Sequence, residues 1–203
     1  MKGEEIKELF IVGIDIAGYS LKALEAQHGA QLNVDRALNE AVKAISTGKK
    51  RGDPEWLDAG DGGYALFEWN SGLEILDLIE SMTETLRREN ASRTSDAQVS
   101  VRVALHCGKV VCWKTVKGSK RFTSNAINEC ARYLAGMARD PGRVVCSKAF
   151  LDRATALNPV VTAIRLKDVK DKHGLAHEVY NLHRIPGLGL QPNAIELYQH
   201  PFV

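Results

Sequence analysis

Two aspartates in this 203-residue sequence each lie beside an apolar run that has the pattern of a β-strand. Asp15 lies within residues 10–20, and Asp61 lies within residues 58–67, between two glycines. A carboxylate in apolar surroundings needs compensation for its lost hydration. Mg²⁺ prefers oxygen ligands and substrate phosphates, so two converging aspartates favour phosphoryl or nucleotidyl transfer by a two-metal route. Taken singly, Asp61 is better explained as a turn former and Asp15 could be a solvated loop residue; only the pair favours chemistry.

A second candidate group is Asn128 with Arg132. Four residues apart, they share one face of a predicted helix. An arginine can stabilise charge on a transferring phosphoryl group, and an asparagine can orient a ribose. Considered alone, both are better explained as residues of a solvated helix face. Residues 17–20 lead into another helix, and the backbone N–H groups at a helix start bind phosphate.

The elements that must position these residues follow from hydrophobic periodicity and turn signals. Helices are expected at 20–46, 71–89, 126–138 (capped by Ser124) and 148–157. Strands are expected at 8–16, 55–59, 63–69, 98–106, 108–116, 144–146, 160–167 and 177–183. A charged turn is expected at 48–54, and the tail from residue 184 is expected to be irregular. This order predicts a mixed sheet flanked by helices rather than a run of parallel βαβ units.

Composition limits the class of protein. A formal net charge of +2 is too small to indicate nucleic-acid binding by bulk electrostatics. The four cysteines have neither Cys-x-x-Cys nor zinc-site spacing, so we expect reduced core thiols. The N-terminus has no signal-peptide pattern, and no apolar run has the length of a membrane span. We therefore expect a cytoplasmic chain that binds neither nucleic acid nor membrane.

Four stretches together resemble the catalytic domain of class III nucleotidyl cyclases, the adenylate and guanylate cyclase family. They are the first strand at 10–20, the Gly-Asp hairpin at 59–67, the Arg-to-His-x-Gly strand at 101–108, and the Asn/Arg helix at 127–132. The resemblance spans about residues 8–183 and includes the last strands. It implies an α+β, ferredoxin-like fold derived from βαββαβ, with a mixed, mostly antiparallel sheet. Residues 1–183 would be the catalytic domain and 184–203 an irregular C-terminal extension.

The resemblance also implies roles for individual residues. Asp15, Asp61 and the carbonyl of Ile16 would bind two Mg²⁺ or Mn²⁺ ions. Asn128 would orient the ribose, and Arg132 would neutralise the α-phosphate. The substrate-binding set would comprise Gly18, Tyr19, Ser20, Leu57, Arg102, Arg121 and Lys170. A nucleoside triphosphate would become a 3′,5′-cyclic monophosphate and pyrophosphate. The metal aspartates and the Asn/Arg helix would come from opposite protomers of a homodimer.

Two positions depart from the family pattern, because Leu57 and Arg121 replace the purine-reading pair. An inactive cyclase, an unusual purine site and a different base are the three explanations. Arginine has only donors, so it matches the acceptors of uracil or cytosine, although it could also meet guanine O6. Equally, Arg121 could be a solvated residue beside the basic run 117–120.

A short chain with this pocket resembles the pyrimidine cyclases of bacterial antiphage signalling (Pycsar), which favours UTP and then CTP. A separate cyclic-nucleotide-binding effector would read the product. The alternatives are an adenylate or guanylate cyclase with an atypical purine pocket, and a catalytically silent, nucleotide-binding dimerisation domain. A diguanylate-cyclase type of domain lacks support, because no Gly-Gly-Asp-Glu-Phe turn occurs.

Overall fold

The computed structural model describes residues 4–46, 53–68, 72–136, 144–155, 161–166, 168–170, 174 and 176–184. The strands are β1 (Glu5–Ile16), β2 (Glu55–Asp58), β3 (Gly62–Phe67), β4 (Val101–Lys114), β5 (Lys120–Thr123), β6 (Val144–Ser147), β7 (Val161–Arg165), β8 (Val169–Lys170), β9 (Ala176–His177) and β10 (Val179–Arg184). The helices are a short 3₁₀ turn η1 (Tyr19–Leu21), α1 (Leu24–Ser46), α2 (Gly72–Asn90), α3 (Asn125–Gly136) and α4 (Lys148–Thr155).

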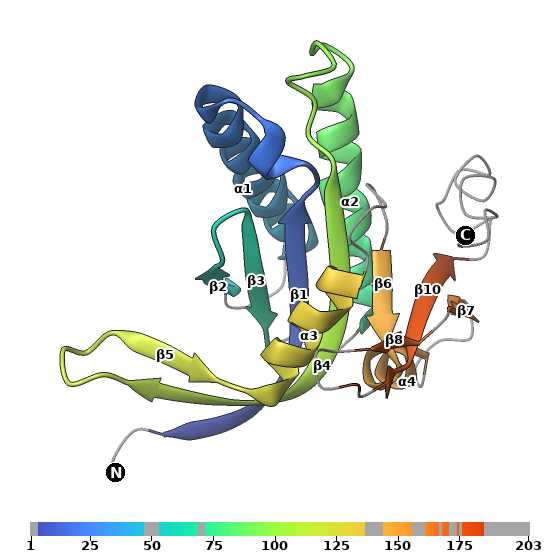
Figure 1. Cartoon of the computed structure of the whole chain (residues 1–203). Coiled ribbons are helices and arrows are strands. Elements are labelled where there is room, and N and C mark those ends of the chain that lie inside the picture. Colours follow the sequence, from blue (N-terminus) through green and yellow to red (C-terminus); the bar gives the residue numbers. More distant parts are fainter. Residues whose placement is uncertain are drawn as a thin grey trace.

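The main sheet has the strand order β2-β3-β1-β4-β6-β10-β7, and β5 pairs with β4 outside this path. Among its described pairs only β4 and β6 are parallel, and the rest are antiparallel. Strands β8 and β9 form a separate two-stranded sheet. Figure 1 shows helices on both faces of the main sheet and the β4–β5 hairpin projecting from it. The predicted mixed, mostly antiparallel α+β fold is confirmed.

Two apolar clusters lie on opposite faces of the sheet. Side chains alternate along a strand, so Phe10, Val12, Ile14 and Ile16 of β1 pack in one cluster with residues of α1, α2 and α4. Leu9 and Ile11 point the other way and pack with α3. The same alternation puts Asp15 on the α3 face, which is the face where the candidate site lies.

The four cysteines are buried and free, as predicted. They are Cys107, Cys112, Cys130 and Cys146. Burial raises the pKa of Cys130 to about 12 and also raises the pKa of Cys146. These thiols therefore stay protonated and pack as apolar groups.

Three expectations about elements were wrong. The predicted strands 98–106 and 108–116 are one strand, because β1 pairs with β4 without a break from Ile16↔Val101 to Glu5↔Cys112. Gly108 is part of that strand. A Cβ there would lie 2.7 Å from the Cβ of Ala126, so the glycine allows α3 to approach the sheet.

The other two corrections concern α1 and β5. Helix α1 begins at Leu24 rather than at residue 20, because η1 precedes it and Gly18 adopts a left-handed φ of 66°. Strand β5 was not expected, since its polar residues show no clear alternation and its pairing with β4 is tertiary information. The predicted features at 47–52, 69–71, 137–143, 156–160 and from 185 onward lie outside the described residues.

Candidate active site

A pocket of about 220 Å³ lies at the end of β1, and the two predicted metal-binding aspartates both line it. Its described lining comprises Ile14, Asp15, Ala59, Asp61, Gly62, Gly63, Tyr64, Arg102, Ala131, Leu134 and Ala135. Asp15 pairs in register with Gly62 of β3 on one side and with Arg102 of β4 on the other. Asp61 directly precedes Gly62, so the sheet brings together three charged residues that are far apart in the sequence: Asp15, Asp61 and Arg102.

The turn that carries Asp61 is held at several points. The N–H of Ile16 donates to the carbonyl of Asp61 at 3.0 Å, which ties the turn to the end of β1. Gly60 has a left-handed φ of 81°, which favours glycine. Its carbonyl accepts a hydrogen bond of 2.5 Å from Nε2 of Gln31 in α1. Gly62 has no room for a Cβ, because that atom would overlap the carbonyl of Ile14. Asp61 is a turn residue, and the turn directs it to Asp15.

Asp15 forms an ion pair with Arg102 across the neighbouring strand. Its Oδ2 accepts from Nε of Arg102 at 2.7 Å and also from Nη2. Both side chains are mostly buried, at 16% and 17% exposure. Burial is the main cause that raises the pKa of Asp15; Arg102 opposes this shift, and the nearby Asp61 adds to it. A cation beside both carboxylates would remove the repulsion between them.

The donor set suits a hard divalent cation. Across the described ranges, no group of three or more His, Cys, Asp or Glu side chains gathers around one point. Two carboxylates are too few for a closed structural zinc site. They suit Mg²⁺, which is usually held by one or two carboxylates together with waters and substrate phosphates. The carbonyl of Ile16 remains a predicted ligand beside them.

Helix α3 presents its two predicted catalytic residues outside this pocket. Ser124 caps the helix, accepting from the N–H of Ala126 at 3.0 Å and donating to the carbonyl of Lys109 at 2.7 Å. The described part of the pocket wall from α3 consists of Ala131, Leu134 and Ala135. Asn128 is exposed and Arg132 is half-buried, and neither is part of that wall. Within its described lining, this pocket therefore contains the aspartates without the Asn/Arg pair.

The predicted phosphate-binding residues Gly18, Tyr19 and Ser20 follow directly after β1. Gly18 and Ser20 are exposed, and Tyr19 packs in part against the core below α1. The predicted helix start is the 3₁₀ turn η1, for which Gly18 is the N-cap. Within this turn the N–H groups of Leu21 and Lys22 donate to the carbonyls of Gly18 and Tyr19. Lys170 lies in β8, where its backbone pairs with Ala176.

The two residues that depart from the cyclase pattern lie on β2 and β5. Leu57 is half-buried and packs on the α3 face. Arg121 is exposed and lies opposite Trp113 in register, so alternation directs it away from Phe122. Phe122 packs with the same cluster as Leu57.

The β5 strand also contacts β2 through charged side chains. The ammonium of Lys120 pairs with the carboxylate of Glu55 and lies 5.3 Å from the ring centroid of Phe122. The face of β5 that reaches β2 therefore carries Lys120 and Phe122.

Sequence reasoning missed Tyr64 and Gln31. Tyr64 lines the pocket, and burial, followed by nearby Cys130, Asp15 and Asp61, raises the pKa of its hydroxyl. Its place could have been found from alternation, because Gly13↔Tyr64 is two residues from Asp15↔Gly62 in register. Gln31 had no comparable signal, since its contact with Gly60 depends on how α1 packs.

Comparison with known proteins identifies the fold. No protein-family model and no curated protein matches this chain. Solved structures do match, among them the guanylate cyclase domain of RhGC from Catenaria anguillulae in complex with GTP, with a TM-score of 0.67, 9% identity, and coverage of 89% of this chain and 98% of that one. The adenylyl cyclase CyaB from P. aeruginosa matches with a TM-score of 0.63, 13% identity, and coverage of 92% and 99%.

An adenylate/guanylate cyclase/hydrolase from Silicibacter pomeroyi matches with a TM-score of 0.66, 16% identity, and coverage of 90% and 99%. These neighbours are class III cyclase catalytic domains, and this chain has their fold. None of the helices in the described ranges has the length and apolar character needed to cross a bilayer.

Proposed function

We propose that this protein is a nucleotidyl cyclase that depends on Mg²⁺ or Mn²⁺. It would convert a nucleoside triphosphate to the 3′,5′-cyclic monophosphate and pyrophosphate. The observation that carries this proposal is the shared pocket of Asp15, Asp61 and Arg102, within a fold similar to cyclase catalytic domains. A pair of carboxylates beside an arginine has the chemistry needed to hold a cation-bound triphosphate.

Each residue has a defined task in this reaction. Bound divalent cations would polarise the phosphates and lower the pKa of the ribose 3′-hydroxyl. Asp15, Asp61 and the carbonyl of Ile16 would hold them. The 3′-oxygen attacks the α-phosphorus, the bond to the pyrophosphate oxygen breaks, and the hydroxyl proton leaves to solvent.

The remaining residues bind the substrate. Arg102 lines the same pocket as the aspartates and would bind the triphosphate. The residues from Gly18 to Ser20 and Lys170 would bind phosphate oxygens as well. Asn128 would orient the ribose, and Arg132 would stabilise charge on the α-phosphate.

The proposed active form is a homodimer. Asn128 and Arg132 are absent from the described lining of the pocket, which supports a site completed by a second copy of the chain. A two-fold pairing makes both contacts at once and forms two equivalent sites. Nucleotide, cation and second subunit are then the partners of the chain.

For the base we propose UTP, then CTP, and a role as second-messenger synthase in antiphage defence, with a separate effector reading the product. Phe122 packs with Leu57, and its bulk supports a small base, while Arg121 on the opposite face of β5 has only donors and supports a base rich in acceptors. A purine is the second candidate. The solved structures with this fold include complexes with GTP and with ATPαS, so the fold accommodates purine nucleotides.

The test is incubation of the full chain with each of the four nucleoside triphosphates and Mn²⁺, followed by mass spectrometry of the products. UTP should be converted faster than CTP. Both should exceed ATP and GTP by about one to two decades, because a hydrogen bond from a charged donor such as Arg121 contributes about 1.5–3 kcal/mol. Preference for ATP or GTP would reject the pyrimidine substrate but leave the cyclase standing. Absence of any cyclic product would favour the silent domain.

The base-reading role is tested by Arg121→Ala, with Lys117→Ala in the same hairpin as the matched control for loss of a charge. Arg121→Ala should erode the preference for UTP over ATP while Lys117→Ala preserves it. Phe122→Leu examines the other face of β5. If only Phe122→Leu changes the preference, the base is read from the face that packs with Leu57.

A further inference from the structure

The connection between α2 and β4, residues 91–100, contacts the turn that follows Asp15 and Ile16. The N–H of Ala17 donates to the carbonyl of Ser100 at 2.9 Å. Nζ of Lys22 donates to the carbonyls of Asp96 at 2.9 Å and Gln98 at 3.0 Å. The turn at residues 17–22, which begins directly after the predicted ligand Ile16, is therefore held by backbone groups of this connection.

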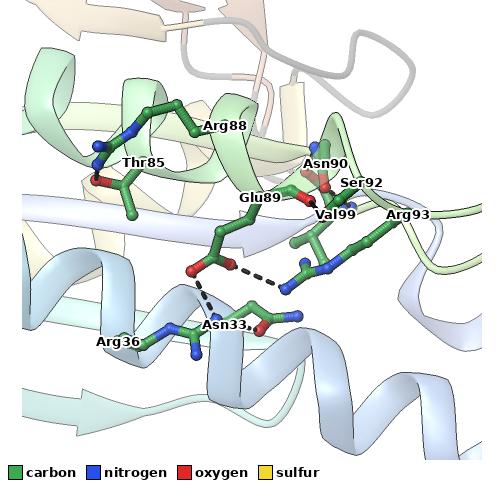
Figure 2. Close-up of polar contacts among 9 residues, drawn as sticks. All are labelled: Asn33, Arg36, Thr85, Arg88, Glu89, Asn90, Ser92, Arg93 and Val99. Atoms are coloured by element: carbon green, nitrogen blue, oxygen red, sulfur yellow. Dashed lines mark hydrogen bonds and ion pairs between the residues drawn. The ribbon is translucent and has the colours of Figure 1, made fainter.

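The connection is itself fastened by Asn90, the last residue of α2. Its Nδ2 donates to the carbonyl of Val99 at 2.8 Å, and its Oδ1 accepts from the N–H of Val99 at 2.9 Å. Figure 2 shows this side chain directed at Val99. The side-chain amide of Asn90 therefore satisfies both the N–H and the carbonyl of buried Val99, which lies two residues before β4 begins. Val101 and Arg102, which open β4, pair in register with Ile16 and Asp15.

An ionic bridge joins the same region to α1. Glu89 forms ion pairs with Arg36 of α1 at 2.6 Å and with Arg93 of the connection at 3.0 Å, as the dashed lines in Figure 2 show. Only 19% of the Glu89 side chain is exposed. Helix α1 also holds the Asp61 turn, through Gln31 and the carbonyl of Gly60. Helix α1 therefore contacts both the Asp61 turn, through Gln31, and the end of α2, through the Arg36–Glu89 ion pair.

We propose that Asn90 and Lys22 are positioning residues for the cation site. They hold the end of β1 against the start of β4, so that Asp15 and the carbonyl of Ile16 face Asp61 before a ligand arrives. Lys22 follows the predicted phosphate-binding residues, yet its ammonium binds two carbonyls, so its role is to fix the turn rather than to bind phosphate. This inference rests on the proposed function, because that function assigns the cation to this pocket.

Groups that orient metal ligands affect affinity without touching the ion, and their loss costs about 10–100-fold. Three variants of the full chain separate the contacts. Asn90→Ala removes both bonds to Val99, Asn90→Asp keeps the acceptor and loses the donor, and Lys22→Met keeps most of the length and loses the ammonium. Ser147→Ala is the matched control, because it removes buried hydrogen bonds at the start of α4, away from the pocket.

Two readouts are measured without nucleotide: Mn²⁺ affinity by electron paramagnetic resonance, and amide hydrogen exchange. Asn90→Ala should weaken Mn²⁺ binding about tenfold or more, and Asn90→Asp should do so less. Exchange should accelerate at Ala17 and at residues 101–103, relative to β3. Ser147→Ala should lower the melting temperature but keep Mn²⁺ affinity within about twofold, since it lacks contact with the turn.

The possible outcomes are distinct. If the wild-type chain does not bind Mn²⁺, the proposed function fails and the inference fails with it. If the wild-type chain binds Mn²⁺ and the Asn90 variants bind equally well, only the positioning role is overturned. Should Asn90→Ala not fold, Asn90→Asp decides by the same two measurements. If Lys22→Met leaves exchange and Mn²⁺ affinity unchanged but raises KM for nucleotide, Lys22 is a phosphate ligand instead.

Discussion

Strand β4 carries two buried polar pairs on one face, four residues apart, and they differ in what surrounds them. Arg102 pairs with Asp15 on the wall of the 220 Å³ pocket. His106 pairs with Ser147, and these residues are only 5% and 1% exposed. The first pair lines a described pocket, whereas the polar atoms of the second bind other protein groups.

The second pair is fully satisfied by protein groups. Nδ1 of His106 lies 2.6 Å from Oγ of Ser147, and its Nε2 lies 3.3 Å from Oε2 of Glu129. Oγ of Ser147 also accepts from the N–H of Phe150 at 3.0 Å, which caps α4. Burial lowers the pKa of His106, so the ring is neutral near pH 7, and one of its nitrogens donates a hydrogen bond while the other accepts one. The comparison separates a polar pair that lines a pocket from one whose polar atoms are bonded to other protein groups.

The largest expected effect comes from removing either of the two carboxylates that line the pocket. Asp15→Asn and Asp61→Asn should each lower cyclase turnover at least about a hundredfold, because each change removes a cation ligand. The change is isosteric, so circular dichroism and gel filtration should remain those of the wild type. Turnover retained by either purified variant would contradict the assignment of the cation site.

The next effect is the pH dependence of cation binding. Because the pKa of Asp15 is raised in the folded chain, protons compete with the cation at higher pH than for an exposed aspartate. Mn²⁺ affinity should fall about tenfold per pH unit below that pKa, as one proton is displaced on binding. Without metal, the raised pKa means that stability declines as pH rises from the unfolded to the folded pKa of Asp15. Calorimetric titrations with Mn²⁺ at several pH values measure the affinity of wild type and Asp15→Asn, and urea denaturation without metal measures their stability. An identical pH dependence in the two proteins would argue against Asp15 as the titrating ligand.

A complementation experiment tests whether the open pocket is finished by a second chain. Asp61→Ala and Arg132→Ala should each be inactive. Refolded together in equal amounts, they should regain about a quarter of wild-type turnover, because half of the dimers are mixed and each has one intact site. Heterodimer content is measured with two different affinity tags. An inactive mixture with proven heterodimers would rule out the shared site.

The smallest effect on activity is expected at the His106–Ser147 pair. Ser147→Ala and His106→Gln should lower the free energy of unfolding by about 1–3 kcal/mol, because each leaves a buried partner unsatisfied. Turnover per folded molecule should stay within about twofold. Urea denaturation followed by the cyclase assay measures the two quantities. A large loss of turnover at unchanged stability would give His106 a part in the reaction.

The burial of His106 in its pair with Ser147 also predicts a pH dependence of stability. The lowered pKa of His106 means that the unfolded chain binds more protons, so wild-type stability should fall as pH drops below about 6.5 towards the folded pKa. His106→Gln should flatten this slope, as urea denaturation at several pH values would show. The sign is opposite to that expected for Asp15.

Most elements could be predicted from the sequence because their patterns are local. The apolar alternation of residues 8–16, the glycines around Asp61 and the serine at 124 each have a physical meaning within a few residues. The helix that carries Asn128 and Arg132 was found in the same way. The convergence of Asp15 and Asp61, by contrast, was only a hypothesis from the sequence, because it depends on how β3 pairs with β1.

The errors and omissions all depend on contacts between distant segments. Gly108 looks like a break in the sequence, but β1 pairs with β4 on both sides of it and Ala126 fills the space of its missing side chain. Strand β5 forms only because β4 offers it an edge. Whether Arg121 or Phe122 points towards Leu57 is decided by the register of that pairing.

The sequence by itself determined which chemical groups are available: two carboxylates, an Asn/Arg pair and a set of basic residues. The tertiary structure decided which of them meet. Arg102 is 87 positions from Asp15, and only the packing of β4 against β1 makes them an ion pair. The same packing leaves a pocket beside Asp15, to which α3 contributes Ala131, Leu134 and Ala135, whereas the Tyr133 ring of α3 packs 5.8 Å from the ring of His106. The sequence specifies which residue types are present, whereas the pocket beside them depends on how separate helices and strands pack.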